Sequence, residues 1–336
     1  MAKQKVIVVG GGIVGCMTAL NLAERGCQVM VVERNQIAAQ TSGESSWAGA
    51  GILFPLLPWM YKDAVNQLAM AGAALYPILC KRLLSETGID PEYTLSGMLI
   101  QPPFDAALGL DWCAKNQIQT RQIGEDLLLP QVAQVRNPRL MQALKQLLIQ
   151  TNVTLLEHTQ LEPLQQTTHI GGWKTTTGAV LEADAFVVTS GAWSFELLKD
   201  TAANLNIKPM RGQILLYQVP QDSLKHIVYQ NGFYLVPRRD GHLLAGSTLE
   251  DVGFDPRTTE DVKQELKTKA ETIMPSLKHA PILKHWSGLR PGTPDNLPTI
   301  AAHPTIQNLY LNTGHFRYGL TMAPASAQRV AALICA

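Results

Sequence analysis

The sequence has little of what marks a disulfide-stapled, metal-binding or nucleic-acid-binding protein. Its five cysteines, Cys16, Cys27, Cys80, Cys113 and Cys335, include no Cys-x-x-Cys pair, and its 8 histidines show no metal-ligand spacing. We therefore expect reduced thiols, no disulfide framework and no metal site. The 28 Lys and Arg balance the 27 Asp and Glu, without a basic block. This balance excludes nucleic acid and an anionic membrane surface as expected partners.

The sequence also lacks an uninterrupted hydrophobic run long enough for a transmembrane helix. The stretch that comes nearest, residues 6–23, is broken by glycines, carries Asn21 and has no signal-type cleavage site. We expect a soluble, cytoplasmic protein that acts on a small molecule, with no integral membrane segment. Its 336 residues suggest about two domains. The oligomeric state stays open, and a homo-oligomer is compatible with the sequence.

What the chain does contain is a strand, a glycine-rich turn and a helix at its start. Residues 6–9 are a β-branched run, followed by Gly10, Gly12 and Gly15 and then by helical periodicity. The first glycine permits a sharp turn, the second lets the backbone approach a pyrophosphate, and the third lets the helix pack closely on the sheet. The pyrophosphate would lie on the helix N-terminus, where the dipole favours an anion. A flexible turn is the simpler alternative for the glycines alone.

A second strand completes the pattern of a dinucleotide-binding βαβ unit. Residues 29–32 are apolar and end in Glu33, eighteen positions after Gly15. Glu33 can accept hydrogen bonds from both hydroxyls of an adenosine ribose, whereas a 2′-phosphate would bring two anions into contact. FAD or NAD is therefore favoured over NADP. The Ser- and Gly-rich loop 41–53 follows the carboxyl end of this strand, where open α/β sheets place ligands, and is expected to line a further part of the cofactor.

Later segments predict a second kind of sheet and a return to the first. A continuous apolar strand at 185–193 is typical of a buried parallel strand, so the nucleotide domain is expected to be discontinuous. Asp240-Gly241 between two apolar runs predicts an antiparallel hairpin. The final strand, glycine turn and helix can close back on the βαβ unit and offer a second helix N-terminus. Helices are predicted over 60–85 (kinked or broken at Pro77), 139–150 after Asn137-Pro138, 260–274 and 320–334 (with Pro324 in its first turn), and strands at 98–100, 153–157, 213–219, 233–237, 242–246 and 309–313.

These segments together resemble the D-amino-acid-oxidase-like family of flavoproteins, and within it the bacterial glycine oxidases of thiamin biosynthesis. The resemblance covers nearly the whole chain. The segments that carry it are residues 10–15 with Glu33, 45–52, 190–194, 210–213, 233–238, 286–295 and 314–320. Residues 45–59 and 135–140 are similar to the proteobacterial glycine oxidases in particular.

The resemblance implies an α/β plus α+β fold, in which a Rossmann-type FAD-binding domain is interleaved with an antiparallel-sheet substrate domain. The FAD-binding domain would comprise residues 1–85, 135–200 and 286–336, and the substrate domain 86–134 and 201–285. FAD is expected to be noncovalent, because the chain has no cysteine between Cys113 and Cys335 for the linkage of the covalent sarcosine oxidases. The expected cofactor-binding residues are Gly10, Gly12, Ile13, Val14, Gly15, Glu33, Arg34, Ser45, Ser46, Ala50, Gly51, Ile52, Leu161, Gly191, Trp193, Gly314, His315, Phe316, Arg317, Tyr318, Gly319, Leu320 and Thr321.

For catalysis and substrate binding the resemblance points to Tyr234, Arg290 and Arg317. A guanidinium fork suits a substrate carboxylate, so Arg290 is favoured as the anchor over an ordinary surface arginine in a Pro-Gly turn. Tyr234 would add a phenolic donor, unless it is simply a core tyrosine. Arg317 would hold the substrate's carbonyl or close the pocket. Leu249 and Ile52 complete the expected substrate site.

Two positions depart from the pattern of the glycine oxidases. Gly232 stands where some of them carry histidine, and Leu249 where they carry methionine. Both departures leave the preferred amino acid open. No general base is required if the amine enters neutral and hydride passes from Cα to flavin N5, so His315 is not assigned as a base.

The function that the resemblance implies is oxidative deamination of glycine and other small amino acids, such as sarcosine and small D-amino acids. O2 would accept the electrons and give peroxide, and the imino acid would hydrolyse to a 2-oxo acid and ammonia or, from glycine, feed thiazole formation. The alternatives are a D-amino acid dehydrogenase that reduces a quinone and a flavoprotein subunit with structural FAD.

Overall fold

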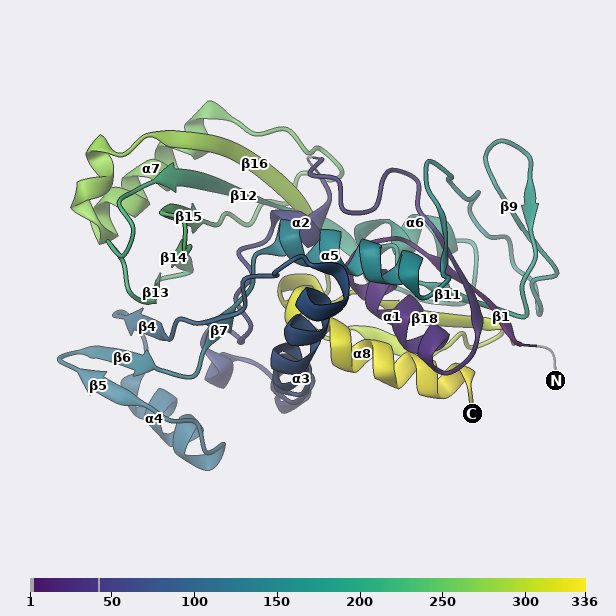
Figure 1. Ribbon diagram of the computed structural model, residues 1–336, viewed down its shortest axis with the longest axis horizontal. Coiled ribbons are helices and arrows are strands. Elements are labelled where there is room, and N and C mark those ends of the chain that lie inside the picture. Colours follow the sequence, from purple (N-terminus) through teal and green to yellow (C-terminus); the bar gives the residue numbers. More distant parts are fainter. Residues whose placement is uncertain (1–2, 42) are drawn as a thin grey trace.

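Two large β-sheets lie in two lobes of the molecule, beside two small two-stranded ones (Figure 1). The structure is a computed structural model that describes residues 3–41 and 43–336. In spatial order, the first sheet consists of β17 Thr299–Ala302, β18 Leu309–Thr313, β11 Ala185–Val188, β1 Lys5–Val9, β2 Gln28–Val32 and β8 Thr154–Leu156. All neighbours in this sheet are parallel except β17 and β18.

The second sheet is mainly antiparallel. In spatial order it consists of β16 Ile282–Gly292, β12 Lys208–Gln218, β15 His242–Gly246, β14 Phe233–Pro237, β13 Ile227–Gln230, β4 Met98–Gln101, β6 Asp126–Leu129 and β5 Arg121–Ile123. Only β13 and β4 run parallel within it. The predicted hairpin is confirmed: Gly241 takes φ +80°, and the Arg238 N–H donates to the His242 carbonyl at 2.8 Å.

The helices are distributed over both lobes. They are α1 Ile13–Glu24, α2 Ser45–Ala48, α3 Asp63–Thr87, α4 Ala106–Lys115, α5 Asn137–Gln150, α6 Ser194–Leu198, α7 Glu260–Ile273 and α8 Gly319–Ile334. Short elements complete the assignment: β3 Thr94–Leu95, β7 Ala133–Gln134, β9 Trp173–Lys174, β10 Val180–Leu181 and the 3₁₀ turns η1 Pro58–Met60, η2 Gly191–Trp193, η3 Pro275–His279 and η4 Phe316–Tyr318.

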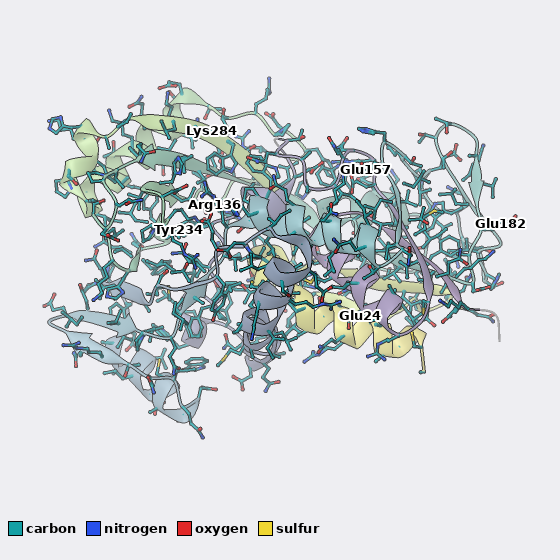
Figure 2. All side chains as sticks on the ribbon, in the orientation of Figure 1. Glu24, Arg136, Glu157, Glu182, Tyr234 and Lys284 are labelled. Atoms are coloured by element: carbon teal, nitrogen blue, oxygen red, sulfur yellow. The ribbon has the colours of Figure 1, made fainter. Side chains whose placement is uncertain are left out.

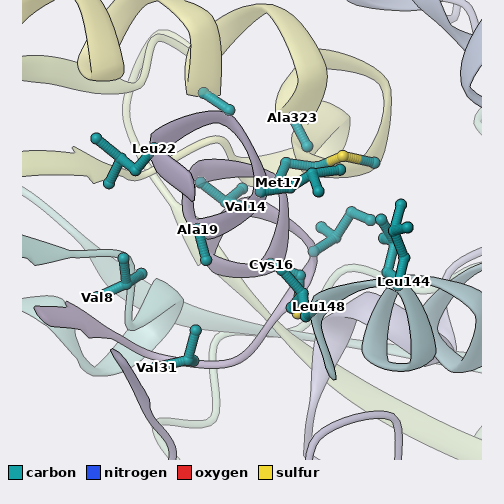
Figure 3. Packing of buried hydrophobic residues seen from close by; sticks show 14 of the residues in the cluster. Val8, Val14, Cys16, Met17, Ala19, Leu22, Val31, Leu144, Leu148 and Ala323 are labelled. Atoms are coloured by element: carbon teal, nitrogen blue, oxygen red, sulfur yellow. The ribbon is translucent and has the colours of Figure 1, made fainter. Parts of the chain in front are cut away.

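The predicted βαβ unit is confirmed by β1, α1 and β2, with β1 between β2 and β11. Val8 and Val31 are fully buried, and each side chain of this kind contributes roughly 1.5–3 kcal/mol of hydrophobic stabilisation. Figure 3 shows Met17 of α1 directed toward Ala323 of α8, with Leu144 of α5 close by in the same cluster. The last helix therefore packs on the first one, as the sequence predicts.

Helix α3 is continuous, so of the predicted kink or break at Pro77 the break is excluded. Pro77 lies on the exposed face of the helix, where the missing N–H costs least because water can satisfy the freed carbonyl. By length and apolar composition α3 is the one helix of the described chain that could cross a membrane. Val65 and Leu68 instead pack against Met322 of α8, as in the core helix of a globular protein.

The placement of Pro324 also differs from the prediction. Helix α8 begins at Gly319, so Pro324 lies in its second turn and not in the first. A proline there leaves the carbonyl four residues earlier, that of Leu320, without its N–H partner. The Tyr76 hydroxyl of α3 donates to that carbonyl at 2.6 Å. A side chain distant in sequence therefore compensates for the proline.

The combination of a mostly parallel and a mostly antiparallel sheet agrees with the predicted fold class. The chain leaves the first sheet after β2 and returns to it for β8 and β11, and again for β17 and β18. The predicted domain limits remain a prediction. Strand β16 runs through residue 286, where one limit was expected, and stays in the second sheet to Gly292.

Candidate active site

A cavity of about 320 Å³ runs from the carboxyl ends of the first sheet's strands to the second sheet. Gly10 and Glu33, which follow β1 and β2, line one end of it, and Ser190 follows β11. Tyr234 of β14 and Arg290 of β16 line the other end. This is the edge of a parallel sheet at which α/β proteins bind ligands, next to the strand where the order reverses.

The first turn of α1 forms the nucleotide end of the cavity. Gly10 takes φ +112°, and Gly12 is the N-cap residue of α1, so the helix begins without a side-chain cap. The N–H of Ile13 is satisfied by the Ser46 hydroxyl at 2.9 Å. Bare glycine backbone and a helix N-terminus therefore face the cavity together, an arrangement that favours an anionic group.

Glu33 is fixed by backbone donors on both sides. The Gly11 N–H donates to one carboxylate oxygen at 2.7 Å, and the Asn35 N–H donates to the other at 2.9 Å. Each carboxylate oxygen has a further lone pair. Glu33 is thereby held at the end of β2 with capacity left for the hydroxyls of a ribose.

Arg34 and Trp193 form the wall beside Glu33. The guanidinium carbon of Arg34 lies 3.5 Å from the centre of a Trp193 ring, within the range of a cation–π interaction. Phe254 lies on the same tryptophan, with ring centres 5.5 Å apart. A long loop of the second sheet thus reaches the nucleotide end.

The middle of the cavity is formed where the loop after β2 meets α8. The Thr321 hydroxyl donates to the Ile52 carbonyl at 3.1 Å, which joins the two walls. Gly51 takes φ +76°, and a Cβ there would lie 2.0 Å from the Val135 carbonyl oxygen. The loop can therefore lie this close to the segment around Val135 only with glycine at this position.

Arg290 is a half-buried cation with no carboxylate among its hydrogen-bond partners in the described part of the chain. Its Nη1 donates to the Thr248 carbonyl at 3.1 Å, and its Nη2 donates to the Ser247 hydroxyl at 2.8 Å. Burial lowers the pKa of Arg290, Tyr234 opposes that shift, and the charge of Arg317 adds to it. An uncompensated buried charge is costly, so the site favours an anionic ligand.

Tyr234 of β14 and Arg317 of η4 both line the cavity and differ in exposure. Tyr234 is buried, and Figure 2 labels it in the middle part of its lobe, below Lys284 of β16 in that view. Arg317 is exposed in η4, with its guanidinium carbon 5.4 Å from the centre of the Phe316 ring. The side chain of Arg317 is therefore less confined by neighbouring residues than that of Tyr234.

Of the residues predicted for the site, all but three line the cavity. Gly15 lies beneath it, where its Cβ would be 1.8 Å from the Gly10 carbonyl oxygen. Gly314 precedes the turn that lines it, and Leu249 is 43% exposed outside it. Gly232, the other departure from the glycine oxidases, lies in a turn where an added Cβ would meet open space.

Two asparagines that line the cavity are not among the predicted site residues. The Oδ1 atoms of Asn137 and Asn312 are buried and have no hydrogen-bond partner within the described residues. The sequence predicts Asn137 only as part of a helix start and Asn312 only as part of a strand. Their one sequence signal is a polar residue inside a buried element, because such a group needs a partner.

The residues present fit FAD. The unpartnered polar atoms of Asn137, Asn312 and His315 lie along the cavity, so a bound cofactor can supply the missing hydrogen bonds. The glycine turn, the helix N-terminus and Glu33 match a pyrophosphate and a ribose. None of the five cysteines, all of them in the described part of the chain, lines the cavity.

His315 predicts how stability depends on pH. Burial lowers its pKa to about 3, against about 6.5 for an unfolded histidine. Below pH 6.5 the histidine binds a proton in the unfolded chain but not in the folded chain. The free energy of unfolding therefore decreases as the pH is lowered. Between pH 6.5 and 4.5 we expect His315 alone to account for about 2 kcal/mol of that fall.

Thermal unfolding of the FAD-saturated protein at both pH values measures this effect. The His315→Asn variant should lose less stability on acidification than the wild type. His169→Asn, at an exposed position, is the control and should behave like the wild type. Equal losses in wild type and His315→Asn would show that His315 is not the buried neutral group.

Comparison with known proteins gives a consistent result. The family model DAO, FAD dependent oxidoreductase, matches residues 5–333. The chain is 41% identical to glycine oxidase of Pseudomonas putida, over 98% of this chain and 93% of that protein. It is 33% identical to the bifunctional protein ThiO/ThiG of Trichormus variabilis, over 98% of this chain and 52% of that protein. The fold is similar to that of glycine oxidase from Bacillus cereus, with TM-score 0.89, 27% identity and coverage of 99% and 95% of the two chains.

Proposed function

Since the chain belongs to the DAO family of FAD dependent oxidoreductases and is an FAD-dependent amino acid oxidase, we propose that it oxidises glycine and other small amino acids, including sarcosine and small D-amino acids. One observation carries the proposal. The cavity joins a nucleotide-binding turn to Arg290, a half-buried cation whose hydrogen-bond acceptors are uncharged. Every amino acid has a carboxylate that can neutralise such a cation.

Arg290 would bind the substrate carboxylate through two parallel hydrogen bonds. Its guanidinium is already oriented by Ser247 and Thr248, so little conformational freedom is lost on binding. Tyr234 would donate a further hydrogen bond to the carboxylate. Together the two side chains would fix which bond of the α-carbon faces the FAD end of the cavity.

FAD, when bound, supplies the acceptor for the hydride that leaves the α-carbon, and the electrons then pass to O2, which becomes peroxide. The chain's contribution is to hold the reacting groups together and to exclude water. His315 remains neutral near pH 7, because its pKa is lowered to about 3 by burial. It therefore adds no positive charge that would repel the substrate's amine. Arg317, exposed at the rim, would close the cavity over the substrate.

We also propose which reactions consume the imino acid product. The imino acid formed from glycine would feed thiazole formation, and other imino acids would hydrolyse to 2-oxo acids and ammonia. The ThiO/ThiG relative supports this placement through its name and its similarity to the whole chain. The protein would act in the cytoplasm with noncovalent FAD, and a homo-oligomer remains compatible.

Peroxide formation across glycine, sarcosine, D-alanine and D-proline tests the proposal. We expect peroxide with glycine and bleaching of the flavin absorbance when glycine is added without O2. Bleaching without peroxide in air, together with reduction of a quinone, would identify a dehydrogenase instead. Absence of bleaching with all four compounds would favour a structural FAD and contradict the proposed function.

A further inference from the structure

A cluster of polar side chains lies behind Arg290 and has no part in the reaction described above. Arg211 is 4% exposed, and its guanidinium donates to Glu250 Oε2 from Nη2 at 2.6 Å and from Nε at 3.2 Å. Glu250 also accepts from Gln213 Nε2 at 3.0 Å and from the Thr248 hydroxyl. The Arg211–Glu250 pair is therefore supported by further hydrogen bonds, the condition under which a buried ion pair is tolerated.

The pair closes an irregular stretch of β-sheet. Gly246 is opposite Ile214 on β12, and Glu250 is opposite Arg211. Between these two pairings β12 advances three residues and the opposite chain advances four, so residues 247–249 contain one extra residue. Such a β-bulge breaks the regular ladder and redirects side chains, often next to a functional site.

Hydrogen bonds join both the end and the interior of the bulge to β12. The backbones of Arg211 and Glu250 exchange two N–H to carbonyl hydrogen bonds, each of 2.9 Å. Inside the bulge, the Thr248 hydroxyl accepts from the Gln213 N–H at 2.9 Å. The Thr248 hydroxyl thus connects the backbone of β12 with the carboxylate of Glu250.

The bulge in turn orients Arg290. The Ser247 hydroxyl and the Thr248 carbonyl accept the two hydrogen bonds from its guanidinium. The guanidinium also lies against the bare backbone of Gly212, where a Cβ would be 2.2 Å from Nη1. The position of Arg290 therefore depends on a segment whose shape is set by Arg211 and Glu250.

We propose that Arg211 and Glu250 are positioning residues for the substrate carboxylate: their ion pair fixes the bulge, and the bulge fixes the Arg290 guanidinium in the orientation that binds two carboxylate oxygens. This inference rests on the proposed function, in which Arg290 is the carboxylate anchor. A merely structural role for the pair would instead lower thermal stability and leave carboxylate affinity unchanged.

Glu250→Gln is the first test variant, because it removes the charge and nearly conserves the shape. Sodium acetate, a carboxylate without an amine to oxidise, serves as the probe, and its binding is followed by the flavin absorbance of the holoenzyme. We expect the acetate dissociation constant and the KM for glycine to rise roughly 3- to 30-fold. The FAD content should stay unchanged, and kcat should fall less than KM rises.

Asp251→Asn is the matched control. Asp251 is the next residue along and pairs with Lys208, but both side chains are more than half exposed, where an ion pair contributes little. Its acetate and glycine constants should stay within twofold of wild type. Thr248→Val is the second test variant, because it keeps the ion pair and removes only the hydroxyl that joins Glu250 to β12. It is the decisive variant if Glu250→Gln does not fold.

The outcomes separate the two proposals. A weaker acetate complex in Glu250→Gln or Thr248→Val, with full FAD, supports the positioning role. Wild-type acetate affinity in the folded variants, even with a lower melting temperature, overturns it and leaves the proposed function standing. If acetate does not bind the wild type and Arg290→Leu has a wild-type KM, Arg290 is not the carboxylate anchor and the positioning role is overturned with it, whereas the proposed function fails only if none of the four compounds bleaches the flavin.

Discussion

Replacing Arg290 with leucine is expected to lower kcat/KM for glycine by roughly 30- to several-thousand-fold, which corresponds to about 2–5 kcal/mol of lost transition-state stabilisation. The substrate's carboxylate would then enter a buried site without a cation, and its α-carbon would lose its alignment. We expect KM to rise steeply and kcat to fall as well. The FAD content should not change, because the residue lies at the opposite end of the cavity from the glycine turn.

Steady-state kinetics on Arg290→Leu with measured flavin occupancy is the test. Arg290→Lys keeps the charge but loses the planar fork, so we expect it to recover only part of the activity. Arg121→Leu, on the exposed strand β5, controls for loss of an arginine elsewhere. If kcat/KM stays within a fewfold of wild type, Arg290 is not the anchor, and Arg317 becomes the candidate for carboxylate binding.

Local sequence patterns predicted the parts of the fold whose cause is local. The βαβ unit is encoded by two short, continuously apolar strands and by glycines at fixed spacing, and the hairpin by Asp240-Gly241 between apolar runs. Each of these features is set by the backbone preferences of a few adjacent residues. Most of the predicted site residues line one cavity, because strand ends and helix starts converge there; the roles assigned to them stay predictions.

Leu249 shows where such reasoning stops. Its neighbours belong to a functional segment, since the Thr248 carbonyl contacts Arg290 and Glu250 pairs with Arg211. The extra residue of the β-bulge shifts the alternation of side chains, so Leu249 is 43% exposed and lies outside the cavity. A one-residue change of register moves a side chain to the opposite face, and no local pattern announces it.

Local sequence patterns also could not predict individual contacts between segments that are distant in the sequence. Pro324 is accommodated through Tyr76, which precedes the accepting Leu320 by 244 residues. The Sγ atoms of Cys27 and Cys335, scattered in the sequence, lie 3.7 Å apart as free thiols. Both arise where α8 packs against α1 and α3. The sequence predicts that this helix returns to the βαβ unit, but only the complete fold determines which side chains then meet.

Gly15→Ala is expected to prevent stable FAD binding and to destabilise the fold by about 3–5 kcal/mol. An alanine Cβ at this position would lie 1.8 Å from the Gly10 carbonyl oxygen and 2.7 Å from the Thr189 hydroxyl. The first contact is with backbone, which cannot rotate away, so α1 has to move off the sheet. Because the glycine turn and the helix N-terminus form the pyrophosphate end of the cavity, that displacement also separates the groups that hold the cofactor.

The measurements are the flavin absorbance of the purified variant and its thermal unfolding with and without added FAD. Gly171→Ala is the matched control, because its Cβ would meet open space and its φ lies outside the positive range that disfavours alanine. We expect that control to retain full flavin and a wild-type melting temperature. If Gly15→Ala were purified with full FAD and wild-type stability, the close approach of α1 to β1 would not be what forms the nucleotide site, and Glu33 with the 41–53 loop would have to account for FAD binding.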